Sequence, residues 1–184
     1  MAQASTDPEL QSQLRRLIRD VPGFPKPGII FRDITPLLAD PQGFSLATEA
    51  MAQPFTDQQI DLVVGAESRG FIFGTAVASL LGCGFIPVRK PGKLPARTIA
   101  QEYSLEYGID KLEMHADAIK PAQRILMVDD LLATGGTMKA CCQMVRQLGG
   151  SIVAVCFLIE LTFLNGRKNL NDYKIHSVLT YNHE

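Results

Sequence analysis

The residues best placed to do chemistry are two adjacent carboxylates, Asp129 and Asp130, between an apolar run and a glycine-rich turn. The stretch 125–137 reads ILMVDDLLATGGT. Its apolar residues 125–128 predict a strand buried on both faces, as in a parallel sheet. The turn predicts backbone N–H groups and small hydroxyls at a helix N-terminus, where the dipole favours a phosphate. An anion cradle beside two acids favours a ligand with both a phosphate and a hydroxylated or positively charged part, such as a phosphorylated ribose.

Two common phosphate-binding loops do not fit this stretch. A P-loop has a lysine after its last glycine, whereas Gly136 is followed directly by Thr137. A dinucleotide fingerprint has the pattern G-x-G-x-x-G, whereas residues 82–84 (GCG) continue as FIP. Taken alone, the acids and the turn are equally compatible with a strand end and a plain helix cap.

Segments elsewhere in the chain give the motif a specific interpretation. The motif is similar to the phosphoribosyl-pyrophosphate (PRPP) motif of type I phosphoribosyltransferases. Four more segments resemble, in order, those of the adenine phosphoribosyltransferase family: 24–36 (FPKPGIIFRDITP), 67–71 (ESRGF), 89–95 (RKPGKLP) and 103–108 (YSLEYG). The resemblance covers roughly residues 10 to 165. It implies an enzyme of purine salvage, a glycosyltransferase that transfers the 5-phosphoribosyl group of PRPP to adenine and releases AMP and pyrophosphate.

The resemblance also implies which residues hold PRPP. The 5′-phosphate would lie on Ala133, Thr134, Gly135, Gly136 and Thr137. Asp129 and Asp130 would bind the ribose hydroxyls. Arg69 would hold the pyrophosphate, in a turn that often contains a non-proline cis peptide in this superfamily. A cationic cluster adds further candidates for the pyrophosphate, namely Arg89, Lys90 and Lys93. Mg²⁺ is expected mainly on PRPP itself, without a dedicated protein site.

The base and the transferred proton have candidates on the same basis. Phe31 would stack on adenine, Ile30 and Arg32 would read its edge through backbone groups, and Leu161 would cover the opposite face. Glu106 matches the proton-handling carboxylate near purine N7. We therefore expect Glu106 and Arg69 to be the catalytic residues. Two tyrosines would pack over the closed site or anchor the lid, Tyr103 and Tyr107.

Ala133 is the residue that discriminates most sharply within the superfamily. The hypoxanthine-guanine enzymes resemble this motif but carry an acid at this position, where it serves a 6-oxopurine. The missing acid is consistent with adenine and with proton handling by Glu106.

The remaining pattern predicts a single α/β domain over residues 1–184. Strand-like runs alternate with helical ones, which favours a doubly wound, mostly parallel central sheet. Strands are expected at 62–65, 85–88, 125–128 and 152–159, with an edge strand at 175–181. Helices are expected at 71–81 and 137–148. Residues 1–40 would form an amphipathic helix and a small base-binding hood, and residues 91–120 a flexible lid loop. The stretch 167–184 resembles the family least and receives no role.

Composition narrows the class of protein. The chain has 46% hydrophobic and 20% charged residues, which is typical of a soluble globular protein. Its net charge of −1 does not indicate the positive charge that binding to nucleic acid requires. The longest apolar run, 152–159, is too short to span a bilayer, and the polar N-terminus is unlike a signal peptide. The four cysteines lack zinc spacing, so we expect free thiols in the cytoplasm. The family resemblance implies a homodimer.

Two other functions are compatible with such a fold. A regulatory protein could sense PRPP or purines without turnover, although such regulators usually add a DNA-binding domain. A phosphoribosyltransferase for xanthine or another base is the second alternative, against which residues 31–32 and Ala133 argue.

Overall fold

The computed structural model describes residues 7–105 and 108–183. Its centre is a parallel sheet in the order β4-β3-β7-β8-β9, so the predicted doubly wound α/β fold is confirmed. The strands are β3 (Leu62–Ala66), β4 (Gly84–Val88), β7 (Arg124–Leu132), β8 (Ser151–Leu161) and β9 (Ile175–Tyr181). β9 lies at the edge, as predicted. Within the described residues, no helix is long and apolar enough to cross a membrane.

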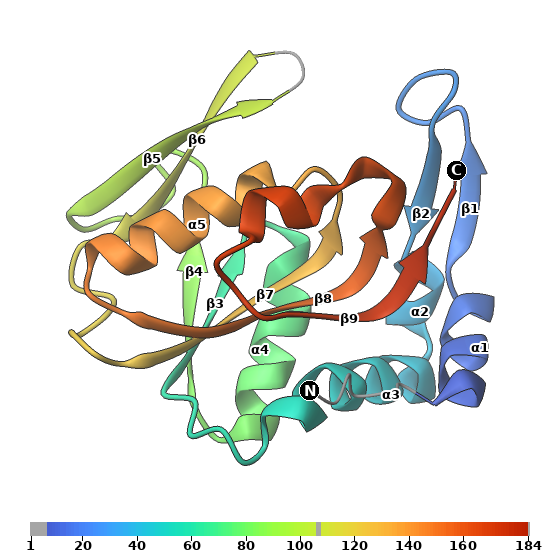
Figure 1. Cartoon of the computed structure of the whole chain (residues 1–184), viewed down its shortest axis with the longest axis horizontal. Helices are drawn as coiled ribbons and strands as arrows, with labels where there is room; N and C mark the ends of the chain where they lie inside the picture. Colours follow the sequence, from blue (N-terminus) through green and yellow to red (C-terminus); the bar gives the residue numbers. More distant parts are fainter. Residues whose placement is uncertain (1–6, 106–107, 184) are drawn as a thin grey trace.

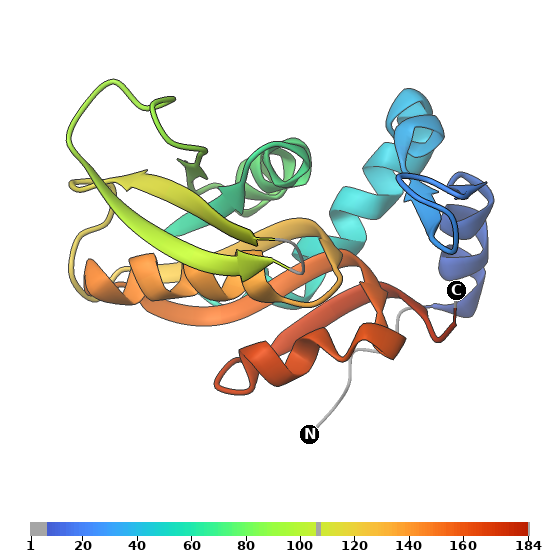
Figure 2. The same ribbon diagram turned by 90° about the horizontal axis from the view of Figure 1, so that it is seen from above.

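Helices cover both faces of this sheet, and Figure 2 shows α4 (Arg69–Leu81) and α5 (Gly136–Gln147) on opposite sides of it. β7 shows why its sequence forms a central strand. Leu126 and Val128 pack in one core cluster together with Phe73 of α4, whereas Ile125 and Met127 pack in the other together with residues of α5. A strand buried on both faces requires an unbroken apolar run, as residues 125–128 provide.

The N-terminal part contains a helix, as predicted, and a small two-stranded ribbon that we call the hood, whose predicted contact with a base stays a prediction. α1 (Pro8–Arg16) and α3 (Pro41–Ala52) pack on the α4 side of the core, and η1 (Gln53–Phe55) follows α3. β1 (Arg19–Pro22) and β2 (Ile30–Asp33) form a two-stranded antiparallel sheet, and α2 (Thr35–Ala39) leads from them into α3. The C-terminal end of the described chain lies beside β1 and β2 (Figure 1).

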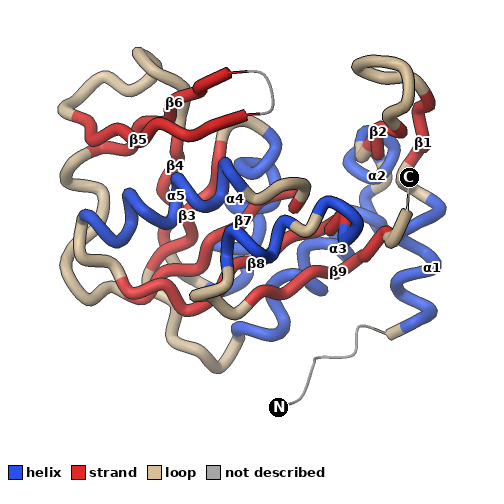
Figure 3. The backbone as a smooth tube through the Cα atoms, turned by 45° about the horizontal axis from the view of Figure 1, so that its top comes forward, coloured by secondary structure: helices blue, strands red, loops and turns tan. Residues whose placement is uncertain are grey.

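The lid segment differs from its prediction as a loop. Most of it forms an antiparallel hairpin of β5 (Thr98–Leu105) and β6 (Gly108–His115). Leu112 and Met114 of β6 are buried against the α5 side of the core, which gives the hairpin an apolar anchor. Figure 3 shows this hairpin and the β1–β2 hood at opposite ends of the molecule.

Two short 3₁₀ helices connect β8 to β9. They are η2 (Thr162–Leu164) and η3 (Gly166–Leu170), and the left-handed residue Asn165 separates them. Leu170 is fully buried, so η3 is fixed to the α5 side of the core.

Candidate active site

The phosphate loop (residues 133–137) joins β7 to α5. β7 continues to Leu132, so the two acids lie inside the strand, whereas the sequence predicted them after its end. The strand is longer than expected because β8 continues alongside it and pairs with Asp129, Leu131 and Leu132. α5 begins at Gly136, one residue earlier than predicted. Gly135 is its N-cap with φ +81°, a conformation that glycine adopts without strain. The unpaired N–H groups of the first turn of α5 therefore start directly at this loop.

The two acids are held in an environment that disfavours ionisation. Burial, followed by the charge of Asp130, raises the pKa of Asp129 well above its ordinary value. Burial also raises the pKa of Asp130, although the Arg69 guanidinium opposes this shift. Arg69 Nε lies 2.9 Å from Asp130 Oδ2, and the Asp130 side chain is only 8% exposed. A ligand that offers hydroxyl donors or positive charge would relieve this repulsion.

These groups surround one cavity of about 250 Å³. Glu67, Ser68 and Arg69 line one part of it, Asp129 and Asp130 another, and residues 131–138 together with Phe157 the remainder. The 5′-phosphate, ribose and Arg69 candidates thus lie around one cavity. The Glu67–Ser68 peptide bond is cis, the type of bond that the resemblance suggested for this turn.

The other predicted pyrophosphate cations do not line this cavity. Arg89 Nε donates to Glu67 Oε2 at 3.1 Å, and Lys90 Nζ lies 2.5 Å from Asp110 Oδ2. Hydrogen bonds from the Lys90 backbone N–H and from Arg89 keep the pKa of Glu67 below its ordinary value, although burial opposes them. Lys93 is exposed. These cations therefore organise the rim around Glu67 and the hairpin.

The lid candidates are only partly covered by the described residues. Tyr103 is half-buried against the α5 side of the core, and its hydroxyl donates to Asp110 Oδ2 at 3.1 Å. Burial is the main cause that raises the pKa of Tyr103. Glu106 and Tyr107 lie outside the described residues.

The hood brings Phe31 to the edge of the cavity. The Arg69 guanidinium carbon lies 5.3 Å from the centre of the Phe31 ring, within the range of a cation–π contact. Phe24 meets the same ring edge-on, with centroids 5.1 Å apart. Arg69 therefore joins the base candidate Phe31 to the ribose candidate Asp130.

The side chain of Arg32 is engaged elsewhere. It forms an ion pair with Asp20 at 2.5 Å and lies over the Tyr181 ring at 4.3 Å. A base could meet Arg32 through its backbone, and base reading by Arg32 and its strand neighbour Ile30 stays a prediction. Leu161 ends β8 opposite Tyr181 in the register and is partly buried against the core.

Comparison with known proteins places the chain in a family. Residues 33–182 match the phosphoribosyl transferase domain. The chain is 56% identical to adenine phosphoribosyltransferase of Pseudothermotoga lettingae over 91% of its own length and 99% of the relative. It is 52% identical to the adenine phosphoribosyltransferase of Koribacter versatilis, over 98% of this chain and 99% of that relative. The chain belongs to the adenine phosphoribosyltransferase family.

Solved structures of this family have the same fold. The adenine phosphoribosyltransferase of Rhodothermus marinus superposes with a TM-score of 0.90 at 51% identity, covering 95% of this chain and 100% of that one. The Saccharomyces cerevisiae enzyme was solved with an imino-altritol bisphosphate and adenine. It superposes with a TM-score of 0.88 at 38% identity, covering 93% of this chain and 99% of that one.

The sequence did not reveal the η3 residues that lie behind the phosphate loop. Gly166, Arg167 and Asn169 lie in η3, and two of them fall in the stretch 167–184 that received no role. One signal was available, because Glu160 is a carboxylate at the end of the apolar run 152–159. A buried carboxylate needs a partner, and Arg167 supplies it.

Proposed function

We propose that the chain transfers the 5-phosphoribosyl group of PRPP to adenine and forms AMP and pyrophosphate in purine salvage. The position of Arg69 is the observation that best supports this function. Arg69 lies between the aromatic ring of Phe31 and the buried carboxylate of Asp130, at the cavity of the phosphate loop. Base, ribose and phosphate sites then occupy one continuous surface.

The ribose phosphate would bind to the rigid part of this surface. The N–H groups and hydroxyls of residues 133–137 would hold the 5′-phosphate at the N-terminus of α5. Asp129 and Asp130 would accept hydrogen bonds from the ribose hydroxyls. Positive charge develops on the ribose as the bond to pyrophosphate breaks, and two carboxylates beside it stabilise that charge.

The leaving group and the proton would be handled from the rim. Arg69 would neutralise pyrophosphate at the cavity, and Arg89, Lys90 and Lys93 would add positive charge at its rim. Glu106 would take the proton from the purine, a role proposed from the sequence resemblance. Glu106→Gln should lower kcat about 100-fold and leave the KM for PRPP nearly unchanged. A comparable fall in kcat and in the affinity for PRPP would show that Glu106 has a general structural role.

Mg²⁺ would enter with PRPP. In the described ranges, no group of three or more His, Cys, Asp and Glu side chains could hold a metal ion. The donors at the cavity are the carboxylates of Asp129 and Asp130, hard oxygen ligands that suit Mg²⁺ when substrate phosphates complete its shell. Bound in this way, the ion supplies neutralisation of the pyrophosphate charge.

Adenine would lie between Phe31 and Leu161, with backbone groups of Ile30 and Arg32 at its edge. Ala133 lines the cavity and offers no carboxylate to a 6-oxopurine. The preference for adenine follows from this.

The assembly and compartment are proposed as well. A homodimer fits the family, and α4 exposes the apolar side chains Ile72 and Leu80 that a second copy could cover. All four cysteines carry free thiols, which fits the cytoplasm. Light scattering of the purified chain distinguishes a dimer from a monomer.

The function is tested by incubating the purified protein with PRPP, Mg²⁺ and each nucleobase in turn. AMP should form from adenine, with far slower turnover of hypoxanthine, xanthine and orotate. Binding of PRPP without turnover of any base would support the regulatory alternative. Turnover of another base in place of adenine would overturn the specificity.

A further inference from the structure

The short helix η3 lies directly behind the phosphate loop. A Cβ atom on Gly135 would come within 2.6 Å of the Gly166 carbonyl oxygen, and one on Gly166 would overlap the Ala133 carbonyl. Asn169 Nδ2 donates to the Thr134 carbonyl at 2.9 Å. The backbone of the loop is therefore in contact with η3 at three successive residues.

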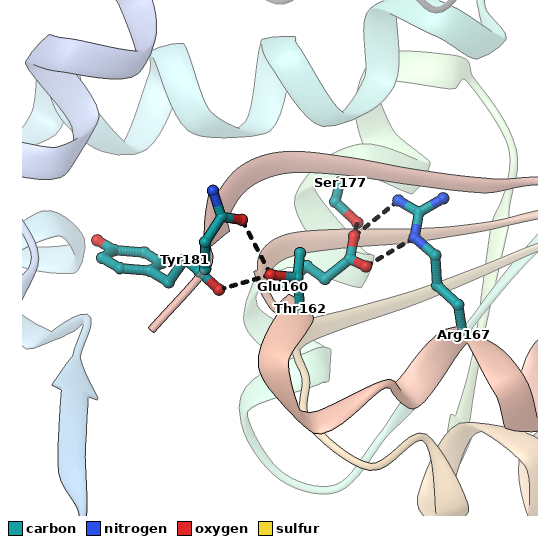
Figure 4. Close-up of polar contacts among 6 residues, drawn as sticks. Glu160, Thr162, Arg167, Ser177 and Tyr181 are labelled. Carbon is teal, nitrogen blue, oxygen red and sulfur yellow. Dashed lines mark hydrogen bonds and ion pairs between the residues drawn. The ribbon is translucent and has the colours of Figure 1, made fainter. Parts of the chain in front are cut away.

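An ion pair between a buried carboxylate and a half-exposed arginine fixes η3 to the sheet (Figure 4). The Glu160 residue is 3% exposed and lies near the end of β8. Arg167 of η3 binds it with two hydrogen bonds, Nε to Oε1 at 2.6 Å and Nη2 to Oε2 at 2.7 Å. Ser177 Oγ of β9 donates to Oε2 at 2.6 Å. Two-point binding fixes the orientation of Arg167 as well as its distance.

The cluster has features that core packing alone does not require. Asn169 is exposed, yet its amide donates to a loop carbonyl, and Lys139 Nζ of α5 lies 3.4 Å from its Oδ1. Two glycines face each other where any side chain would separate η3 from the loop. Both features control the backbone that would meet a phosphate.

We propose that η3 is a brace that positions the 5′-phosphate loop. Gly166 and Asn169 are positioning residues that hold the backbone of residues 133–135, and Glu160, Arg167 and Ser177 hold η3 itself. The brace rests on the proposed function, since its ligand is the phosphate of a ribose 5-phosphate. N–H groups that are fixed before the ligand arrives bind an anion without a cost of ordering.

Asn169→Leu is the sharpest test because the side chain keeps nearly its size, stays neutral and loses its donor to the Thr134 carbonyl. It should weaken binding of ribose 5-phosphate about tenfold, measured by calorimetry, and raise the KM for PRPP similarly. The KM for adenine and the unfolding temperature should stay near the wild-type values. Gly166→Ala should act more strongly in the same direction. Lys168→Ala is the matched control on the exposed side of η3.

The outcomes separate the brace from the function on which it rests. If the wild type makes AMP and Asn169→Leu and Gly166→Ala bind ribose 5-phosphate like Lys168→Ala, the brace is overturned while the function stands. A lower unfolding temperature with unchanged binding would also overturn it, since the contacts would then serve stability alone. A wild type that binds neither ribose 5-phosphate nor PRPP would overturn both.

Discussion

The phosphate loop and the hood are held in place by different means. The loop lies between a strand buried on both faces and η3, and its glycine backbone is in van der Waals contact with η3. The hood is a two-stranded ribbon, and ion pairs join its own two strands. Arg19 and Asp33, one such pair, lie 2.5 Å apart with Arg19 largely exposed, and Phe24 is 53% exposed.

This difference suggests a division of labour. Close packing against η3 would hold the phosphate loop nearly rigid, whereas exposed ion pairs are weak and would allow the hood to adjust. We infer that the ribose phosphate binds to a preformed surface and the base to an adaptable one. Substitutions on the two sides should therefore affect different substrates.

The largest effect is expected from Gly135→Ala. The new Cβ would combine an unfavourable φ with a clash against the Gly166 carbonyl, so the loop must move. A displacement of this size should lower kcat/KM for PRPP about 100-fold in steady-state kinetics. Gly82→Ala is the matched control, since Gly82 has φ +66° and open space around it. Equal losses in both variants would show that backbone strain alone is responsible.

Arg69→Ala acts at the junction of the two regions. It removes the proposed pyrophosphate contact and the cation that holds down the pKa of Asp130. The KM for PRPP should rise on the order of several tens of times, which is the loss of affinity expected when one charge-assisted hydrogen bond to pyrophosphate is removed. Pyrophosphate binding measured by calorimetry should weaken in parallel. Unchanged binding of both ligands would refute the role of Arg69.

Phe31→Ala tests the hood. Loss of an aromatic stacking partner should raise the KM for adenine about tenfold or more, and the KM for PRPP should stay nearly constant. Phe31→Tyr keeps the ring and should behave like the wild type. An equal rise in both KM values would contradict the separation of the two regions.

Asp129→Asn has the smallest expected effect and tests stability. The fold raises the pKa of Asp129, so stability falls as the pH rises from the ordinary pKa of an unfolded carboxyl towards the raised pKa, because only the unfolded state ionises freely in that range. Asparagine stays neutral and retains an acceptor for the Asp130 N–H. The variant should unfold about 2–4 °C higher than the wild type at pH 7, and the difference should vanish below about pH 4. A lower unfolding temperature at pH 7 would contradict the pKa shift.

The same contrast explains what the sequence could predict. The apolar runs and the motif at 129–137 are local, so they indicated the parallel sheet, the loop and the acid pair. The β5–β6 hairpin was mistaken for a loop because residues 91–120 are rich in Pro, Gly, Tyr and charge, which hid the short alternation of Leu112 and Met114 around Glu113. The contact of Arg69 with Phe31 joins residues far apart in the chain and left no local pattern. Arg89 and Lys90 were assigned by charge alone, and their partners Glu67 and Asp110 become visible only in three dimensions.

The most direct test of the account is to measure ribose 5-phosphate and adenine binding separately by calorimetry in Gly135→Ala and Phe31→Ala. If ribose 5-phosphate must bind before adenine, adenine binding is measured at saturation with it. Gly135→Ala should lose affinity for ribose 5-phosphate and keep its affinity for adenine, and Phe31→Ala should show the reverse. Equal losses for both ligands in either variant would contradict a rigid phosphate region joined to a separately held base region.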